Sequence, residues 1–396
     1  MTIIVYNSPL PHLNSTARCL VFATLAAALA GAWLGLTVRF NYQGNWSALF
    51  MTGGNIGAPP GPDFRNTYVF AGSNGYDGQF YRIVAHDPGL RRGLLIDSPR
   101  LRYRRILLPV LAYALALGNL RRVDAALIAV VIGFLFLGVY WMGRWAVLQR
   151  RSPAWGMAFA ALPAALVSLD RMTTDVALAA LLCGWAVYAA DRRAEWKFCA
   201  VLLCLPLVRE TGLLLNAASA LAEAGARRFR RAAAVLAAAI PFLFWSLYVA
   251  SRTPSEPNNW LAHPPFAGIV AAFLYASGEP ARLPMRAVVV FLNYAACCGM
   301  ALAIGLSVIL WLRRRGDSLA IAALLFALVA IQVTPDDLWI HVFGYGRILS
   351  PMLLLLALHA LAARRPLFFV PLLLVLPRVL CQFAPQALGI IRGVFG

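Results

Sequence analysis

The strongest constraint on this chain is a succession of apolar segments, most of them bounded by short polar turns. Several segments reach the roughly 20 residues that a helix needs to cross the hydrocarbon core of a membrane. We therefore predict an all-α, polytopic transmembrane helical bundle of about eleven spans, forming a single domain over residues 1–396. The apolar segments are residues 19–38, 106–119, 123–147, 153–169, 176–190, 198–208, 212–222, 232–251, 287–312, 318–334, 348–362 and 367–383.

The composition excludes several classes of protein. Hydrophobic residues make up 61% of the chain and charged residues only 13%, whereas an ordinary soluble domain is about 25% charged. This balance excludes a soluble enzyme, a disordered chain and a secreted disulfide scaffold. The net charge of +19 is explained either by basic loops on the cytoplasmic side or by contact with anionic lipid headgroups. We therefore expect membrane lipid as a partner, and no nucleic acid.

Arginine clusters in short turns predict the orientation of the spans. We assign the basic turns at 150–151, 192–193, 227–231, 313–315 and 364–365 to the cytoplasmic side. The segment 39–105 then becomes a long first outer loop, and 252–286 a second outer loop. Four of the sixteen acidic residues fall on the inner side, which leaves twelve on the outer side. This one-sided distribution is consistent with chemistry on the outer face.

Two segments depart from a simple up-and-down pattern. Residues 106–119 are too few to span a membrane and are predicted to be interfacial or re-entrant. Residues 198–222 carry Arg209 and Glu210 near their middle and basic turns at both ends. We predict that they form two short helices that meet near the outer surface, and not one span.

The first outer loop contains a short helical pattern that begins at Asp77. Apolar residues recur from Phe80 to Val84, and Asp87 followed by Pro88 ends the pattern. We predict an amphipathic helix in the plane of the headgroups, with Asp77 at its N-cap. The Asp77 carboxylate would then lie at the membrane boundary, as a cap, as a catalytic base, or as both.

A dense cluster of arginines follows in the same loop. Arg100, Arg102, Arg104 and Arg105 fall within six residues, directly before an apolar segment. Guanidinium groups match the geometry of phosphate. The cluster therefore predicts either a grip on the phosphate of a lipid carrier or contact with anionic lipid in general.

Other polar residues on the predicted outer side are candidates for substrate binding. Charges inside an apolar segment face a partner or a cavity, so Arg209 and Glu210 form either a structural pair or part of a binding site. Asp170 and Asp175 share one short outer turn, where Asp175 is also placed to cap the next helix.

The last outer segment offers aromatic, cationic and acidic groups. Tyr345 is either an aromatic residue of the membrane interface or a stacking partner for a sugar, and Arg347 is placed to close over a phosphate. Asp336 and Asp337 could bind a divalent cation, although two adjacent acids alone support a metal site poorly. We predict no required cofactor or metal.

Several of these motifs resemble one family. The chain is similar to the bacterial polytopic glycosyltransferases of the GT-C class, most of all to the PIG-V-like mannosyltransferase branch and to related membrane proteins of cell-surface glycopolymer formation. The motifs are Tyr76-Asp77-Gly78-Gln79-Phe80-Tyr81, Asp87-Pro88, Arg102-Tyr103-Arg104-Arg105-Ile106-Leu107-Leu108-Pro109, Asp170-Arg171-Met172-Thr173-Thr174-Asp175, Leu207-Val208-Arg209-Glu210-Thr211-Gly212 and Gly346-Arg347-Ile348-Leu349-Ser350-Pro351.

The resemblance implies an inverting glycosyltransferase of the bacterial inner membrane, with its active site on the periplasmic face. The donor would be a polyprenyl-phosphate sugar, and the acceptor a cell-surface glycan or a lipid-linked molecule. Asp77 would be the catalytic base. Many GT-C loops carry two adjacent acids, whereas Tyr76 and Gly78 flank Asp77 here, which puts metal assistance in doubt.

Two other functions stay open at this level. A transporter or flippase for a lipid-linked sugar would also need an arginine-rich outer pocket, but would place charges in several spans, whereas Arg209 and Glu210 are the main exception here. An oligosaccharide ligase would place its largest outer loop in the second half of the chain. Here the largest loop follows the first span.

Overall fold

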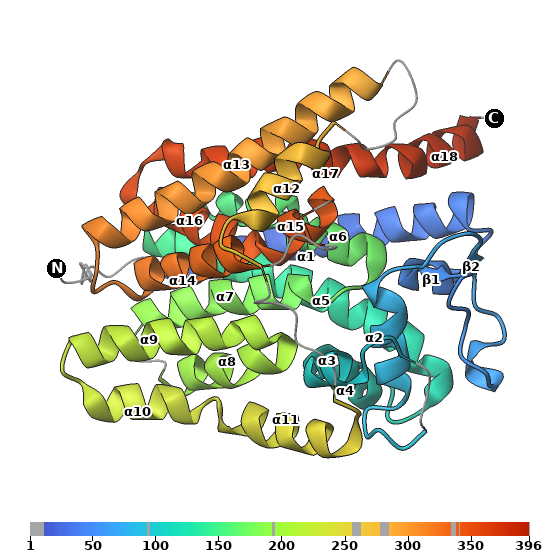
Figure 1. Cartoon of the computed structure of the whole chain (residues 1–396), viewed down its shortest axis with the longest axis horizontal. Helices are drawn as coiled ribbons and strands as arrows, with labels where there is room; N and C mark the ends of the chain where they lie inside the picture. The colour runs from blue at the N-terminus through green and yellow to red at the C-terminus, as the bar shows by residue number, and fades with distance from the viewer. Residues whose placement is uncertain are drawn as a thin grey trace.

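The computed structural model describes residues 12–92, 96–191, 195–255, 263–277, 285–333, 338–339 and 341–395. Most of this part of the chain is helical, as predicted (Figure 1). Two strands of two residues each, β1 (Thr52–Gly53) and β2 (Val69–Phe70), pair in parallel within the first polar loop.

Five helices of the described chain are long and apolar enough to cross a membrane, and seven if each of two bent pairs counts as one span. Two of the five are runs of consecutive helices, one of two elements and one of four. The two bent pairs change direction by 58° and 53°. The structure therefore supports a helical membrane protein but does not confirm about eleven spans. The five are α1 (His12–Asn41), α5 (Leu120–Leu148), α10 (Phe229–Ala237) with α11 (Ile240–Arg252), α13 (Arg286–Arg313), and η6 (Pro366–Phe369) with α17 (Val370–Leu380), η7 (Cys381–Phe383) and α18 (Ala384–Phe395); the bent pairs are η3 (Pro153–Ala161) with α6 (Pro163–Arg171) and α15 (Val342–Ile348) with α16 (Ser350–Ala363).

Shorter elements complete the bundle and form most of its polar end. Two of them, α7 and α14, are apolar helices below the length of a full span. The remaining elements are η1 (Trp46–Phe50), η2 (Pro62–Phe64), α2 (Asp77–His86), α3 (Pro99–Arg104), α4 (Leu107–Leu115), α7 (Asp175–Ala190), α8 (Glu195–Val208), η5 (Glu210–Gly212), α9 (Leu213–Gly225), α12 (Ala267–Tyr275) and α14 (Ser318–Gln332).

Two of the basic turns lie at one end of the bundle, and the turn at 192–193 lies outside the described residues. The α9–α10 and α13–α14 connections are both at the left in Figure 1, whereas α2, α3, the two strands and the C-terminus are toward the right. These two connections carry arginine clusters at 227–231 and 313–315. The polar elements of the first loop are therefore at the end opposite the arginine-rich turns.

The helices α5, α7 and α16 contribute many residues to the hydrophobic core. Residues Val176–Val187 of α7 and Ser350–Leu361 of α16 are buried throughout. Small residues allow close approach of the helices at these interfaces. A Cβ atom on Gly138 of α5 would lie 2.2 Å from the ring of Phe159, so only glycine permits this contact.

The predicted break within residues 198–222 is confirmed, whereas the interfacial or re-entrant position of residues 106–119 stays a prediction. Helix α8 ends at Val208, and α9 begins at Leu213 after the short η5 turn. The segment 106–119 contains only the nine-residue α4. The C-terminal helical region continues to Phe395, beyond the predicted end at residue 383.

The prediction that α2 lies as an amphipathic helix on the surface is wrong. Every residue from Gly78 to His86 is buried. The polar side chains on the face expected to meet water have buried partners instead: Gln79 accepts a hydrogen bond from Gly53 N, and Arg82 pairs with Asp124 of α5. The N-cap is Tyr76, and Asp77 is the first helical residue.

Gly78 allows α2 to dock against the end of α6. A Cβ atom at this position would lie 2.0 Å from the carbonyl oxygen of Arg171, a backbone atom that cannot move aside as a side chain could. We expect Gly78→Ala to reduce stability by about 1–3 kcal/mol, the usual cost of overpacking, and to lower the thermal unfolding midpoint in detergent. Gly133→Ala in α5 is the matched control, because its Cβ would meet nothing within 4 Å; an equal loss in both variants would contradict this account.

Candidate active site

The Asp77 carboxylate lies between two arginines from distant parts of the chain. Asp77 Oδ1 is 3.0 Å from Arg102 Nη1, and Asp77 Oδ2 is 2.8 Å from Arg347 Nη2. The side chain of Asp77 is 22% exposed, whereas those of Arg102 and Arg347 are 8% and 6% exposed. The structure therefore brings the predicted base together with two of the predicted phosphate-binding residues.

The same charge network continues through Asp175 to Arg209. Arg347 Nε is 3.5 Å from Asp175 Oδ2, and Arg209 forms a close ion pair with Asp175 Oδ1. The side chains of Asp175 and Arg209 are 4% and 2% exposed. Positive and negative groups thus alternate from Arg102 through Asp77, Arg347 and Asp175 to Arg209.

Arg105 and Glu210 form a second pair next to this chain of charges. Arg105 makes a close two-pronged contact with the Glu210 carboxylate and donates a hydrogen bond of 3.1 Å to the Tyr81 hydroxyl. Since Tyr81 belongs to α2 and Arg105 follows α3, this contact fixes the two helices relative to each other. The Arg209–Glu210 turn therefore serves two partners, Asp175 and Arg105.

A polar cluster that the sequence analysis missed anchors α2 to α5. Arg82 Nη2 and His86 Nε2 contact the Asp124 carboxylate at 2.7 and 2.9 Å, and Arg82 also donates to the Thr67 hydroxyl. Arg82 and His86 are four residues apart, so they lie on one face of the helix. Two features of the sequence could have predicted this cluster: the spacing of Arg82 and His86, and the presence of Asp124 near the start of an otherwise apolar span.

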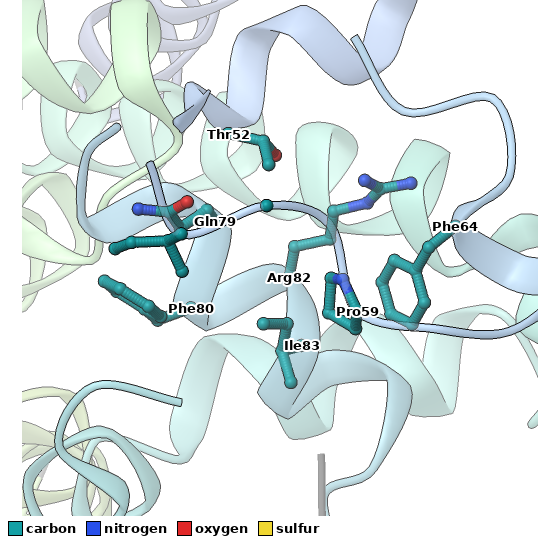
Figure 2. A pocket seen from close by; sticks show the side chains of 9 residues that line it. Thr52, Pro59, Phe64, Gln79, Phe80, Arg82 and Ile83 are labelled. Carbon is teal, nitrogen blue, oxygen red and sulfur yellow. The ribbon is translucent and has the colours of Figure 1, made fainter. Parts of the chain in front are cut away.

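A small pocket lies beside α2. Figure 2 shows Arg82 of α2 beside Pro59 and Phe64 of the preceding loop, with Gln79 and Phe80 on the other side of the pocket. The Phe80 ring also lies 4.8 Å from the Arg102 guanidinium, so it separates this pocket from the charge network. The full lining is Thr52, Ile56, Gly57, Pro59, Phe64, Gln79, Phe80, Arg82 and Ile83.

The sequence analysis also did not identify Tyr76 as part of the candidate site. Its ring lies between the guanidinium groups of Arg171, at 4.5 Å, and Arg347, at 4.9 Å. Cation–π contacts of this kind are stronger where water is excluded. Tyr76 therefore helps to hold Arg347 against Asp77, which directly follows Tyr76 in the sequence.

The electrostatic environment keeps Asp77 ionised. Burial by itself would raise the pKa of Asp77, but Arg347 and Arg102 outweigh it and hold the pKa well below its usual range. The carboxylate is thus available to accept a proton at neutral pH. A carboxylate held this tightly is also a weak base for as long as both ion pairs persist.

Several buried polar atoms in and beside the network lack a hydrogen-bond partner among the described residues. Burying such an atom unpaired costs roughly 1–3 kcal/mol, so a group of them indicates a place where water or a ligand binds. They are Arg347 Nη1, Arg209 Nε and the hydroxyls of Thr174 and Thr211.

In the described part of the chain, three of the predicted site residues, Asp170, Arg104 and Tyr345, have no ion pair with the charge network that contains Asp77. Asp170 pairs with Arg171 at 3.2 Å and accepts a hydrogen bond from Gln386 of α18. Arg104 is half-buried, and its Nε has no partner in the described chain.

Tyr345 is 2% exposed and stacks on Trp339, with ring centroids 5.3 Å apart. It is therefore packed inside the protein, which disagrees with the role of an aromatic residue at the membrane interface. The alternative role, stacking on a sugar, stays a prediction.

The described residues contain no group of three or more His, Cys, Asp or Glu side chains arranged to hold a metal ion. The predicted cation ligands Asp336 and Asp337 lie outside the described residues.

Comparisons with known proteins give no relative: no family model, no curated protein and no solved structure matches this chain.

We expect Asp175→Asn to be strongly destabilising. It would leave Arg209 and Arg347 buried without their shared counter-ion, and removing one partner of a buried ion pair typically costs about 3–5 kcal/mol. Thermal unfolding in detergent should show a marked decrease in the midpoint. Asp63→Asn is the control, because its pair with Arg92 is more exposed and such pairs contribute about 0–1 kcal/mol. Equal stability of the two variants would show that the Asp175 pairs are not structural.

Proposed function

We propose that this chain is a polytopic membrane glycosyltransferase of the GT-C type, with about eleven spans. It transfers a sugar from a polyprenyl-phosphate donor to a cell-surface glycan or lipid-linked acceptor. The reaction takes place on the outer face of the bacterial inner membrane, with inversion at the sugar.

The observation that carries the proposal is the position of the Asp77 carboxylate. Of the two carboxylates that bridge a pair of arginines, Asp77 is 22% exposed and Asp175 only 4% exposed. A group that exchanges protons with a substrate must be within reach of that substrate. Asp77 meets this requirement. The guanidinium groups of Arg102 and Arg347 lie 3.0 and 2.8 Å from its carboxylate and are suited to stabilise a leaving phosphate.

The chemistry follows from this arrangement. The acceptor hydroxyl oxygen attacks the anomeric carbon of the donor, and Asp77 accepts the hydroxyl proton. The bond between that carbon and the phosphate oxygen breaks, and the phosphate leaves with the electron pair. Arg102 and Arg347 stabilise the charge that the phosphate gains. Because the hydroxyl attacks opposite the leaving group, the configuration inverts.

The distribution of charge supports the proposed orientation. The arginine-rich turns at 227–231 and 313–315 are at one end of the bundle, and α2 and α3 are toward the other (Figure 1). Positive charge in short loops stays on the cytoplasmic side. The candidate site then faces outward, where a lipid-linked donor can reach it from within the membrane.

We expect membranes that contain the wild-type chain to transfer label from radiolabelled polyprenyl-phosphate sugars. Asp77→Asn should lower the rate by about 10²-fold or more, because the acceptor proton loses its base. Asp63→Asn, an ion-paired acid of the same loop that does not contact the network's arginines, should keep the wild-type rate. Full turnover by Asp77→Asn would remove Asp77 from this role, and no transfer by the wild type with any donor would reject the proposed function.

We also expect the two ends of the bundle to face opposite sides of the membrane. Arg65→Cys, near the candidate site, should react with an impermeant maleimide in spheroplasts, whereas Ala226→Cys in the α9–α10 turn should react only after permeabilisation. Both positions are exposed. The exposed Cys199 and Cys298 are first replaced by serine to remove background labelling. The reverse pattern would place the site in the cytoplasm.

A further inference from the structure

In the described structure, carboxylates already pair with the arginines proposed to hold the donor phosphate. Arg102 is shared between Asp77 and Asp97, and Arg347 between Asp77 and Asp175. A phosphate oxygen and a carboxylate oxygen need the same guanidinium N–H groups. A donor phosphate can therefore contact both arginines fully only if a carboxylate moves away.

We infer that Asp77 occupies the phosphate position of the ligand-free protein, so that phosphate and the Asp77 carboxylate exclude each other there. This inference rests on the proposed function and deepens it. Phosphate binding breaks the two ion pairs that make Asp77 a weak base. The arrival of the donor thus frees the group that the reaction needs, and Asp77 stays paired while the site is empty.

The contacts indicate why Asp77 and not Asp175 would move. Asp175 is nearly inaccessible and keeps two arginines neutralised, whereas Asp77 lies on the first turn of α2 and is partly exposed. Arg102 keeps its second partner, Asp97, at 2.7 Å when Asp77 leaves. Arg347 keeps Asp175 and its contact with the Tyr76 ring. Both arginines thus stay in position for the phosphate.

Two further observations agree with an anion at this position. Arg347 Nη1 is buried without a hydrogen-bond partner among the described residues, so a donor is available in addition to the one that Asp77 uses. The charges of Arg102, Arg105, Arg209 and Arg347 are balanced by Asp77, Asp97, Asp175 and Glu210. A phosphodiester adds one negative charge to this balanced set. Within the set, Asp77 is the carboxylate that contacts both Arg102 and Arg347, so its displacement frees N–H groups of both arginines while each keeps another partner, Asp97 or Asp175.

The test is a binding measurement on the full chain in detergent, with inorganic phosphate and farnesyl phosphate as separate probes. We expect folded Asp77→Asn to bind farnesyl phosphate about tenfold more tightly than the wild type, as for removal of a competing ion pair. Equal tightening with inorganic phosphate would identify the phosphate group alone as the competitor, and tightening restricted to farnesyl phosphate would identify a lipid-borne phosphate. Asp63→Asn should bind both probes as the wild type does.

Binding by folded Asp77→Asn that equals or falls below that of the wild type would overturn the inference. A measurement on the wild-type chain covers the case in which this variant does not fold. Labelling with a water-soluble carbodiimide and an amine, followed by peptide mass spectrometry, should show more reaction at Asp77 when either probe is bound. Glu195, at the other end of the bundle and 64% exposed, is the internal reference. No increase at Asp77 would also overturn the inference.

The results of this binding test can be distinguished from the results of the sugar-transfer test of the proposed function. Competition between phosphate and Asp77 in a chain that transfers no sugar would reject the glycosyltransferase and keep the anion site. Sugar transfer that depends on Asp77, without tighter phosphate binding by Asp77→Asn, would keep the enzyme and reject the competition.

Discussion

The compensation of buried charge organises the polar end of this molecule. A guanidinium or a carboxylate buried alone is very costly, and each becomes acceptable only when groups of opposite sign lie at contact distance. Arg102, Asp77, Arg347, Asp175 and Arg209 meet this requirement by alternating in sign. They come from α2, α3, α7, α15 and the turn before η5, so a single electrostatic network connects five separate parts of the chain.

Less conspicuous contacts set the geometry of that network. Asp124 holds Arg82 and His86, which orients α2 on α5, and Gly78 leaves room for the carbonyl of Arg171. Tyr81 ties α2 to Arg105. Precise placement of reacting groups depends on such supporting contacts. Here they come from a helix that is buried from Gly78 to His86, which restricts how far its backbone can shift.

Parts of this structure follow from the sequence and parts do not. Apolar length predicted α1, α5 and α13, and the charged pair Arg209–Glu210 predicted the break between α8 and α9. The bend at residue 162 was not predicted, because the segments on both sides of it are apolar and a length criterion counts them as one span. The helix α15, which precedes the bend at residue 349, was not predicted either, because the polar residues before residue 348 were assigned to an outer segment.

The site was predicted in part for a similar reason. Asp77, Arg102, Arg209 and Arg347 were found because charge stands out in an apolar chain. The ion pairs among them were not predicted, and neither was the hydrogen bond between Asp170 and Gln386, because contacts between distant residues leave no local pattern in the sequence.

The order of these residues along the chain has a consequence for biosynthesis. Asp77 and Asp175 are synthesised well before Arg347, which lies 270 and 172 positions later. The nascent protein therefore carries two acids that each lack one of their two counter-ions, and the charge network is completed only when the last helices are inserted.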